Sequence, residues 1–183
     1  MKSEMRTELL ELIKDKAYFR EKITLSSGKE SDYYIDARLI TLTSKGAYLC
    51  AELMLDLIKD DDYKSIGGPT LGADPLIGAV GVVSLQRKNP INTFIIRKTS
   101  KGHGKKQLIE GPPLTKGDRV VIIDDVATTG KAFLYSIDVL KELGIEVVKA
   151  VCIVDRQEGA AEAVKAKGVE LVSIFKAEEI HVN

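Results

Sequence analysis

Two adjacent carboxylates stand where a strongly apolar run of the sequence ends. The stretch VVIIDDVATTG, residues 120–130, places Asp124 and Asp125 after four apolar residues, and a loop of small and hydroxyl-bearing residues follows. If this stretch forms a strand, a loop and the start of a helix, backbone N–H groups and the positive helix end point toward a bound anion. Glycine at position 130 permits a close approach of the backbone. The pattern therefore predicts a phosphate site beside two acids.

The two acids narrow the kind of phosphate compound. Neighbouring residues of a strand point to opposite faces, so Asp124 and Asp125 can serve two different groups. Carboxylates repel a bare phosphate, but they bind ribose hydroxyls or a hydrated Mg²⁺. A sugar phosphate with Mg²⁺ would satisfy both halves of the stretch. One acid could instead be a solvated helix cap, but two acids followed by TTG favour a ligand site.

The elements around this stretch alternate between strands and helices. Apolar runs predict strands at residues 65–68, 92–98, 119–126, 146–155 and 169–175. Helical periodicity predicts helices at residues 4–16, 44–60, 73–87, 131–143 and 159–167, with Ser44 as an N-cap and Gly144 as a terminator. Two short β-like runs, KITL and DYYIDAR, come after the first helix. The alternation predicts an α/β fold with a doubly wound, mostly parallel sheet, whose ligands bind beyond the carboxyl ends of the strands.

Composition sets the broad class of protein. The chain has 183 residues, 44% of them hydrophobic, with 27 basic and 27 acidic residues. This suits a single domain over residues 1–183, and the zero net charge argues against a nucleic-acid partner. The charged start lacks the apolar centre of a signal peptide, and no apolar stretch is long enough for a bilayer, so we expect no membrane partner and a cytoplasmic location. Cys50 and Cys152 lie in apolar segments and are expected to be reduced core residues.

Two other phosphate motifs do not fit. A Walker A loop needs Gly-Lys-Ser/Thr after its variable residues, and GGPTLGAD has Ala73 and Asp74 there. A dinucleotide fingerprint needs three spaced glycines, and KGHGKKQL supplies only two of them.

The stretch VVIIDDVATTGKA resembles the signature for phosphoribosyl diphosphate (PRPP) of type I phosphoribosyltransferases. Three further stretches, LSSGKESDYYIDAR, RKTSKGHGKKQLIEG and VDRQEG, are similar to the orotate-specific members of this family, over about residues 20–160. The resemblance implies the type I phosphoribosyltransferase fold, with a small N-terminal hood over about residues 1–43. It also implies the reaction of orotate with PRPP, with Mg²⁺, to give orotidine 5′-monophosphate and pyrophosphate in pyrimidine biosynthesis.

The resemblance implies roles for the residues that would hold PRPP. Asp124 and Asp125 would bind ribose hydroxyls and, through water, the metal, and Asp125 would be catalytic. The expected PRPP-binding set is Arg97, Lys98, Asp124, Asp125, Val126, Ala127, Thr128, Thr129, Gly130 and Lys131. SIGGPTLGADP resembles the family's pyrophosphate loop, which often holds an unusual cis peptide, with Gly68, Pro69, Thr70, Leu71 and Gly72 as its turn. An ordinary strand-to-helix turn is the alternative for this stretch.

The stretch RKTSKGHGKK is basic and contains two glycines, and the first acid after it is Glu110. Cations that close over PRPP would stabilise the charge that grows on the leaving pyrophosphate, and closure would exclude water. The resemblance points to Lys101 for charge stabilisation and to His103 as a proton donor, whose ordinary pKa is near working pH. A solvated surface loop is the alternative. Residues 98–116 form a long connection that cannot bury itself, so we expect a homodimer whose lids reach the neighbouring subunit.

The base is expected to contact Arg156, Thr128 and Lys29. Arg156 suits the carboxylate of orotate through a two-pronged contact, although a surface arginine is the alternative. The hood stretch SSGKESDYYID offers Lys29 and either Tyr33 or Tyr34. Ser26 departs from the family, because many orotate-specific members have a lysine there that touches pyrophosphate. Without that lysine, the contact with pyrophosphate would be lost, or Lys29 or the lid would make it.

Two other functions remain open from the sequence. The first is a phosphoribosyltransferase for a purine base, which would not need an arginine at position 156. The second is a non-catalytic regulator that binds PRPP or a nucleotide on the same fold. A regulator would not need Lys101 and His103, and we would expect it to carry an added nucleic-acid-binding segment or a basic face.

Overall fold

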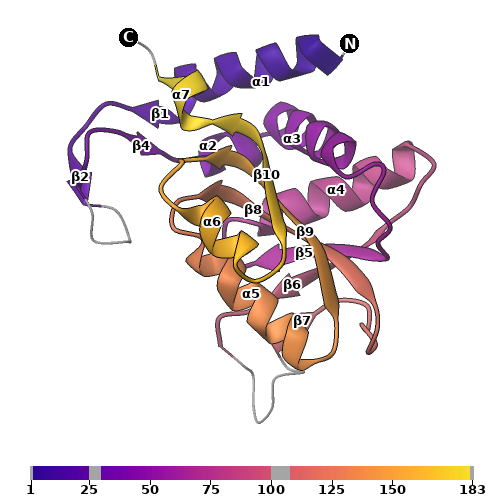
Figure 1. Ribbon diagram of the computed structural model, residues 1–183. Helices are drawn as coiled ribbons and strands as arrows, with labels where there is room; N and C mark the ends of the chain where they lie inside the picture. The colour runs from indigo at the N-terminus through magenta and orange to yellow at the C-terminus, as the bar shows by residue number, and fades with distance from the viewer. Residues whose placement is uncertain (1, 25–29, 100–107, 182–183) are drawn as a thin grey trace.

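The computed structural model describes residues 2–24, 30–99 and 108–181, and its centre is a six-stranded sheet (Figure 1). The strand order is β10-β9-β8-β5-β6-β7. Neighbouring strands run parallel except β6 and β7, which pair antiparallel at one edge. The strands are β5 (Ser65–Pro69), β6 (Asn92–Ile96), β7 (Ile109–Glu110), β8 (Arg119–Ala127), β9 (Glu146–Asp155) and β10 (Glu170–Lys176). The predicted doubly wound, mostly parallel sheet is confirmed.

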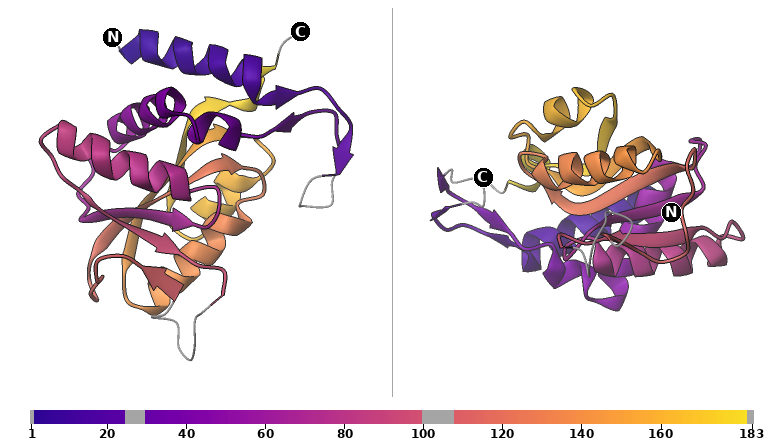
Figure 2. Two further views of the ribbon diagram at one scale, coloured as in Figure 1. Left: turned by 180° about the vertical axis from the view of Figure 1, so that it is seen from behind. Right: turned by 90° about the horizontal axis from the view of Figure 1, so that it is seen from below.

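Helices cover both faces of this sheet (Figures 1 and 2). One layer is formed by α1 (Lys2–Lys16), α3 (Ser44–Leu57) and α4 (Asp74–Gln86), which share a hydrophobic cluster with one face of the sheet. The other layer is formed by α5 (Lys131–Glu142) and α6 (Ala160–Lys165). Two short helices complete the set: α2 (Arg38–Thr41) precedes α3, and α7 (Ala177–Ile180) follows β10.

Strand β8 contributes side chains to a hydrophobic cluster on each face of the sheet, and near its end it carries Asp124 and Asp125, the acid pair. Val121 and Ile123 pack with α1, α3 and α4, whereas Val120 and Ile122 pack with α5 and α6. All four side chains are fully buried, and each contributes about 1.5–3 kcal/mol of burial free energy. Because side chains alternate along a strand, the same alternation directs Asp124 toward α5 and Asp125 toward α4.

The N-terminal segment forms two small antiparallel ribbons beyond the main sheet (Figure 1). Strand β1 (Tyr18–Phe19) pairs with β4 (Tyr34–Ile35), and β2 (Ile23–Thr24) pairs with β3 (Glu30–Ser31). We call residues 18–24 and 30–36 the hood, a narrower segment than the predicted residues 1–43, because α1 packs in the helix layer on the sheet. The prediction that DYYIDAR is β-like holds only for Tyr34 and Ile35. The chain turns at Asp36, whose side chain accepts a hydrogen bond from the backbone of Arg38 at 3.2 Å, and α2 begins there.

Other boundaries differ from the prediction by local chemistry. The N-cap of α3 is Thr43, not Ser44, because the Thr43 hydroxyl accepts a hydrogen bond from the Gly46 N–H at 3.1 Å. Gly144 follows the end of α5 with φ +74°, as expected. The expectation that residues 98–116 stay outside the core is wrong for residues 108–110. Leu108 is buried, and β7 returns along the edge of β6.

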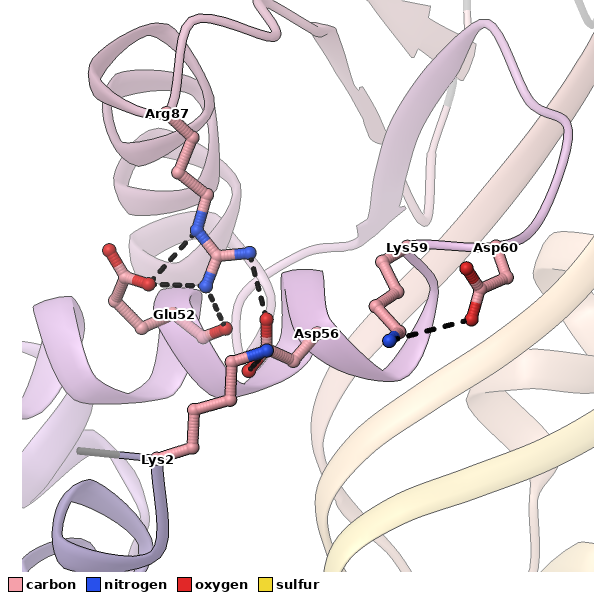
Figure 3. Close-up of polar contacts among 6 residues, drawn as sticks. All are labelled: Lys2, Glu52, Asp56, Lys59, Asp60 and Arg87. Carbon is pink, nitrogen blue, oxygen red and sulfur yellow. Dashed lines mark hydrogen bonds and ion pairs between the residues drawn. The ribbon is translucent and has the colours of Figure 1, made fainter.

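Helices α3 and α4 are joined by a cluster of charged side chains around Arg87 (Figure 3). The guanidinium of Arg87 binds the carboxylate and the backbone carbonyl of Glu52, and its Nη1 donates to Asp56 at 3.1 Å. Lys2 of α1 contacts the other oxygen of Asp56 at 2.9 Å. Since α4 directly follows the loop after β5, this cluster fixes the helix that supports that loop.

Both cysteines are buried and free, as predicted. Burial raises the pKa of the Cys50 thiol to about 12. Across the residues that the structure describes, no helix is long and apolar enough to span a membrane.

Candidate active site at the carboxyl ends of the strands

Two adjoining cavities, each of about 460 Å³, open at the carboxyl ends of β5 and β8. The first cavity runs along the turn between β8 and α5, and the second lies between the hood, the loop after β5 and the acid pair. Both are lined by Pro69, Lys98, Asp124, Val126, Thr128 and Ala132. The shared lining makes them two parts of one site.

The floor of the first cavity is the turn from Ala127 to Gly130. Gly130 has φ +77° and precedes the first residue of α5, Lys131. A Cβ at position 130 would lie 3.2 Å from the Cα of Ala160 in α6, so both the left-handed backbone and the packing require glycine. The unpaired N–H groups of the first turn of α5 therefore face the cavity as an anion cradle.

The acid pair is held by the backbone around it. The N–H of Asp125 donates to Asp124 Oδ1 at 2.9 Å, and the N–H of Val126 donates to Asp125 Oδ1 at 2.7 Å. Only 7% of Asp124 is exposed, and burial raises its pKa well above the usual range, with the charge of Asp125 adding to this. Burial also raises the pKa of Asp125. A cation close to both carboxylates would offset this repulsion.

This donor set fits a hard divalent cation. In the described part of the chain, no three His, Cys, Asp or Glu side chains gather into a metal-binding group. If such a cation binds here, Asp124 and Asp125 would be its protein ligands, and water and ligand oxygens would complete its coordination. Mg²⁺ is commonly bound in this way, because it keeps several waters and uses one or two carboxylates with substrate phosphates.

The loop after β5 brings the backbone against Asp125. The bond between Thr70 and Leu71 is cis, as the family resemblance implied. A Cβ at Gly72 would lie 2.6 Å from Asp125 Oδ1, so any side chain at this position would displace the carboxylate. Pro69, Thr70, Leu71 and Gly72 all line the second cavity. Gly68 lies in β5, and its own Cβ position is 2.1 Å from the Ile123 carbonyl oxygen, so it serves strand packing.

Arg156 also lines the second cavity. Its backbone N–H donates to the Ala127 carbonyl at 2.9 Å, which places it beside Thr128. Its side chain is buried, with Nε donating to Glu158 at 2.8 Å and Nη2 to the Ser31 hydroxyl at 2.9 Å. The guanidinium carbon lies 4.2 Å from the ring centroid of Tyr33. The alternative of a surface arginine is wrong, because the side chain is buried and is held by Glu158 and by Ser31 and Tyr33 of the hood.

The remaining predicted residues divide into three groups. Lys98 lines both cavities, and its charge acts against burial on the pKa of Asp124. Arg97 lies outside the described lining of both cavities, and its Nη1 pairs with Glu110 of β7 at 3.0 Å. Lys29, Lys101, His103 and the departure at Ser26 lie outside the described residues.

Sequence reasoning assigned no role to Asp36 and Arg38, and both line the second cavity. The available signal was the Asp-x-Arg that ends DYYIDAR, where an acid and a base two residues apart follow an apolar strand. The aromatic side of the first cavity was missed as well. Tyr135 of α5 lines it, and its hydroxyl donates to the carbonyl of Arg97 at 2.8 Å.

Comparison with known proteins agrees with this site. The phosphoribosyl transferase domain family matches residues 39–182. The chain therefore belongs to the phosphoribosyltransferase family. Its similar relatives include the orotate phosphoribosyltransferase of Streptomyces coelicolor, 41% identical over 179 residues, with 97% of this chain and 98% of the relative covered.

Solved structures give the same result. Orotate phosphoribosyltransferase of Mycobacterium tuberculosis H37Rv in complex with PRPP has a TM-score of 0.81 at 38% identity, covering 97% of this chain and 99% of that chain. The adenine phosphoribosyltransferase of Thermoanaerobacter pseudethanolicus is 18% identical with a TM-score of 0.65, covering 91% of this chain and 99% of that chain. The second likeness shows a common fold alone.

Proposed function

We propose that this chain transfers the phosphoribosyl group of PRPP to orotate, forming orotidine 5′-monophosphate and pyrophosphate in pyrimidine biosynthesis. The observation that carries the proposal is the buried Arg156, which shares one cavity with the acid pair. An anion cradle and two acids suit any ribose phosphate. A buried guanidinium in the same cavity adds a site for an anionic base.

PRPP is bound through three sets of groups. The cradle from Ala127 to Lys131 binds its 5′-phosphate, because the N-terminus of α5 presents free N–H groups there. Asp124 and Asp125 bind the ribose hydroxyls. The backbone of residues 70–72 binds the diphosphate, and Gly72 keeps this group close to Asp125.

The reaction breaks the bond between the anomeric carbon of PRPP and a diphosphate oxygen, and orotate forms the new bond to that carbon. Negative charge grows on the leaving diphosphate, so nearby cations stabilise the transition state. Lys98 is one such cation, and Lys101 of the lid is a second. His103 donates a proton to the departing diphosphate. Mg²⁺, when bound, supplies further positive charge there, and Asp124 and Asp125 hold it through water.

Orotate is bound between the hood and the turn at Thr128. Arg156 takes its carboxylate with a charged hydrogen bond, and Lys29 and Thr128 contact the ring. The contacts of Arg156 with Glu158 and Ser31 fix the guanidinium before the base arrives. A neutral purine would leave this arginine without its ligand, which disfavours the purine alternative.

The active unit is a cytoplasmic homodimer in which each lid, within residues 98–116, contributes to the neighbouring site. Apolar side chains on the outside of α4 support the dimer, since Val82 and Leu85 are 61% and 65% exposed. Val82 and Leu85 are three residues apart on α4, so they lie on one side of the helix, and we call these two residues the apolar face.

The test is pyrophosphate release from PRPP with five bases: orotate, uracil, adenine, hypoxanthine and guanine. We expect release with orotate alone. Release with a purine base instead would identify that purine, rather than orotate, as the substrate. Binding of PRPP without turnover of any base would favour the regulator over the enzyme.

A further inference from the structure

Asp36 and Arg38 line the second cavity together with the loop of residues 70–72. They stand where the hood strand β4 ends and α2 begins. Neither residue belongs to the anion cradle or to the acid pair. The proposed function assigns no role to this charged pair.

Asp36 holds the guanidinium of Arg38 in one orientation. Nε donates to Oδ1 at 3.0 Å and Nη2 donates to Oδ2 at 3.2 Å, so the contact is two-pronged. The side chain of Arg38 is nevertheless 44% exposed. A planar guanidinium that is fixed on one edge and open to solvent is prepared to bind an anion at low entropic cost.

The position of Arg38 identifies the part of the substrate that it meets. Gly72 abuts the carboxylate of Asp125, and Arg38 lines the same cavity as both residues. Arg38 therefore lies near the place where the loop meets the acid pair. Arg156 is already assigned to the base, and it is tied to Ser31 and Glu158.

We infer that Arg38, oriented by Asp36, contacts the diphosphate of PRPP and the pyrophosphate product. This rests on the proposed function, because it uses the assignment of the diphosphate to residues 70–72. The nucleotide product has no diphosphate. Arg38 should therefore distinguish the ligands that carry this group from the one that does not.

The experiment measures the binding of PRPP, pyrophosphate and orotidine 5′-monophosphate by calorimetry, each with Mg²⁺, to the full chain and to Arg38→Gln. Loss of a charged hydrogen bond should raise the Kd of PRPP and pyrophosphate about ten- to a hundredfold. The Kd of orotidine 5′-monophosphate should change by less than about twofold. The thermal midpoint should stay close to that of the unaltered chain, because the side chain is largely exposed.

Arg119→Gln is the matched control. Arg119 is 40% exposed and pairs with Asp62 at 2.6 Å, but it lies at the opposite end of β8. This variant should leave all three affinities unchanged. Equal weakening of all three ligands by Arg38→Gln would assign Arg38 to the fold of the hood, and unchanged pyrophosphate affinity would remove the contact. Either result overturns the inference, whereas turnover by the unaltered chain tests the proposed function separately.

Discussion

Asp124 and Asp125 are held where two carboxylates are unfavourable without a ligand. Their pKa values are raised in the folded chain, from an ordinary value of 3.8, by burial first. Between the unfolded and the folded pKa, the folded chain binds more protons than the unfolded chain. Stability of the ligand-free protein therefore falls as pH rises through this window, and the loss persists at neutral pH. The buried acid pair therefore lowers the stability of the ligand-free protein, and the same pair is in place to bind substrate.

Replacing Asp125 with asparagine should separate these two effects. Asparagine still accepts the hydrogen bond from the Val126 N–H, but it carries no charge. At neutral pH we expect a strong loss of turnover and of Mg²⁺-dependent PRPP affinity, with an equal or higher thermal midpoint. Asp118→Asn is the control, and its expected effect on the thermal midpoint is the opposite, because hydrogen bonds from Thr115 and Lys64 lower the pKa of Asp118. That variant should lower the midpoint and leave activity unchanged, and unchanged PRPP affinity in Asp125→Asn would refute its assignment.

Arg156→Ala should act on the base rather than on PRPP. Loss of a charged hydrogen bond to the carboxylate costs about 1.5–3 kcal/mol, so the KM for orotate should rise roughly tenfold or more. The KM for PRPP should rise far less. Steady-state kinetics with each substrate varied in turn measures both values, with Arg119→Ala as the control. Equal effects on the two substrates would make Arg156 a structural residue.

The elements were predictable where the apolar pattern is long, and less so where side chains compete locally. Strand β8 was predicted because four apolar residues in a row need two covered faces. Strand β7 has two residues and carries no periodic signal of its own, so only its pairing with β6 reveals it. The position of Arg97 was not predictable, because its partner Glu110 lies on that returning strand. Likewise, Arg38 enters the cavity through a turn that begins with its own contact to Asp36.

Arg87 links α3 to α4, so its removal should be felt in stability more than in chemistry. Arg87→Met leaves Glu52 and Asp56 without their common partner, and half-buried carboxylates lose charged hydrogen bonds. We expect a loss of about 1.5–3 kcal/mol in the free energy of unfolding, measured by urea denaturation. Lys59→Met is the control in the same region, since Lys59 contacts the exposed Asp60 at 3.7 Å (Figure 3). Its effect should be below about 0.5 kcal/mol, and a similar loss in both variants would contradict a special role for Arg87.

At the scale of the whole molecule, the apolar face should decide the oligomeric state. Val82→Asp introduces a charge into a contact that must lose water, so the variant should be monomeric at concentrations where the unaltered chain is dimeric. Analytical ultracentrifugation over a dilution series measures this. Ala161→Asp, in α6 on the opposite layer, should remain dimeric. A dimer that survives Val82→Asp would place the interface elsewhere.

If the lids cross as proposed, activity requires the dimer, and complementation tests this. Lys101→Ala and Asp125→Asn should each be inactive alone, because one lacks the lid cation and the other lacks the strand-end carboxylate. When their subunits exchange, a mixed dimer with crossed lids has one site with both defects and one site with neither. Activity should then return to about half of the unaltered value for each mixed dimer, under two-fold symmetry. If each lid serves its own subunit, every site carries one defect and activity stays lost despite measured exchange. That outcome would remove the crossed lid and leave the roles of Asp125 and Arg156 untouched, because both residues line a cavity built within a single chain.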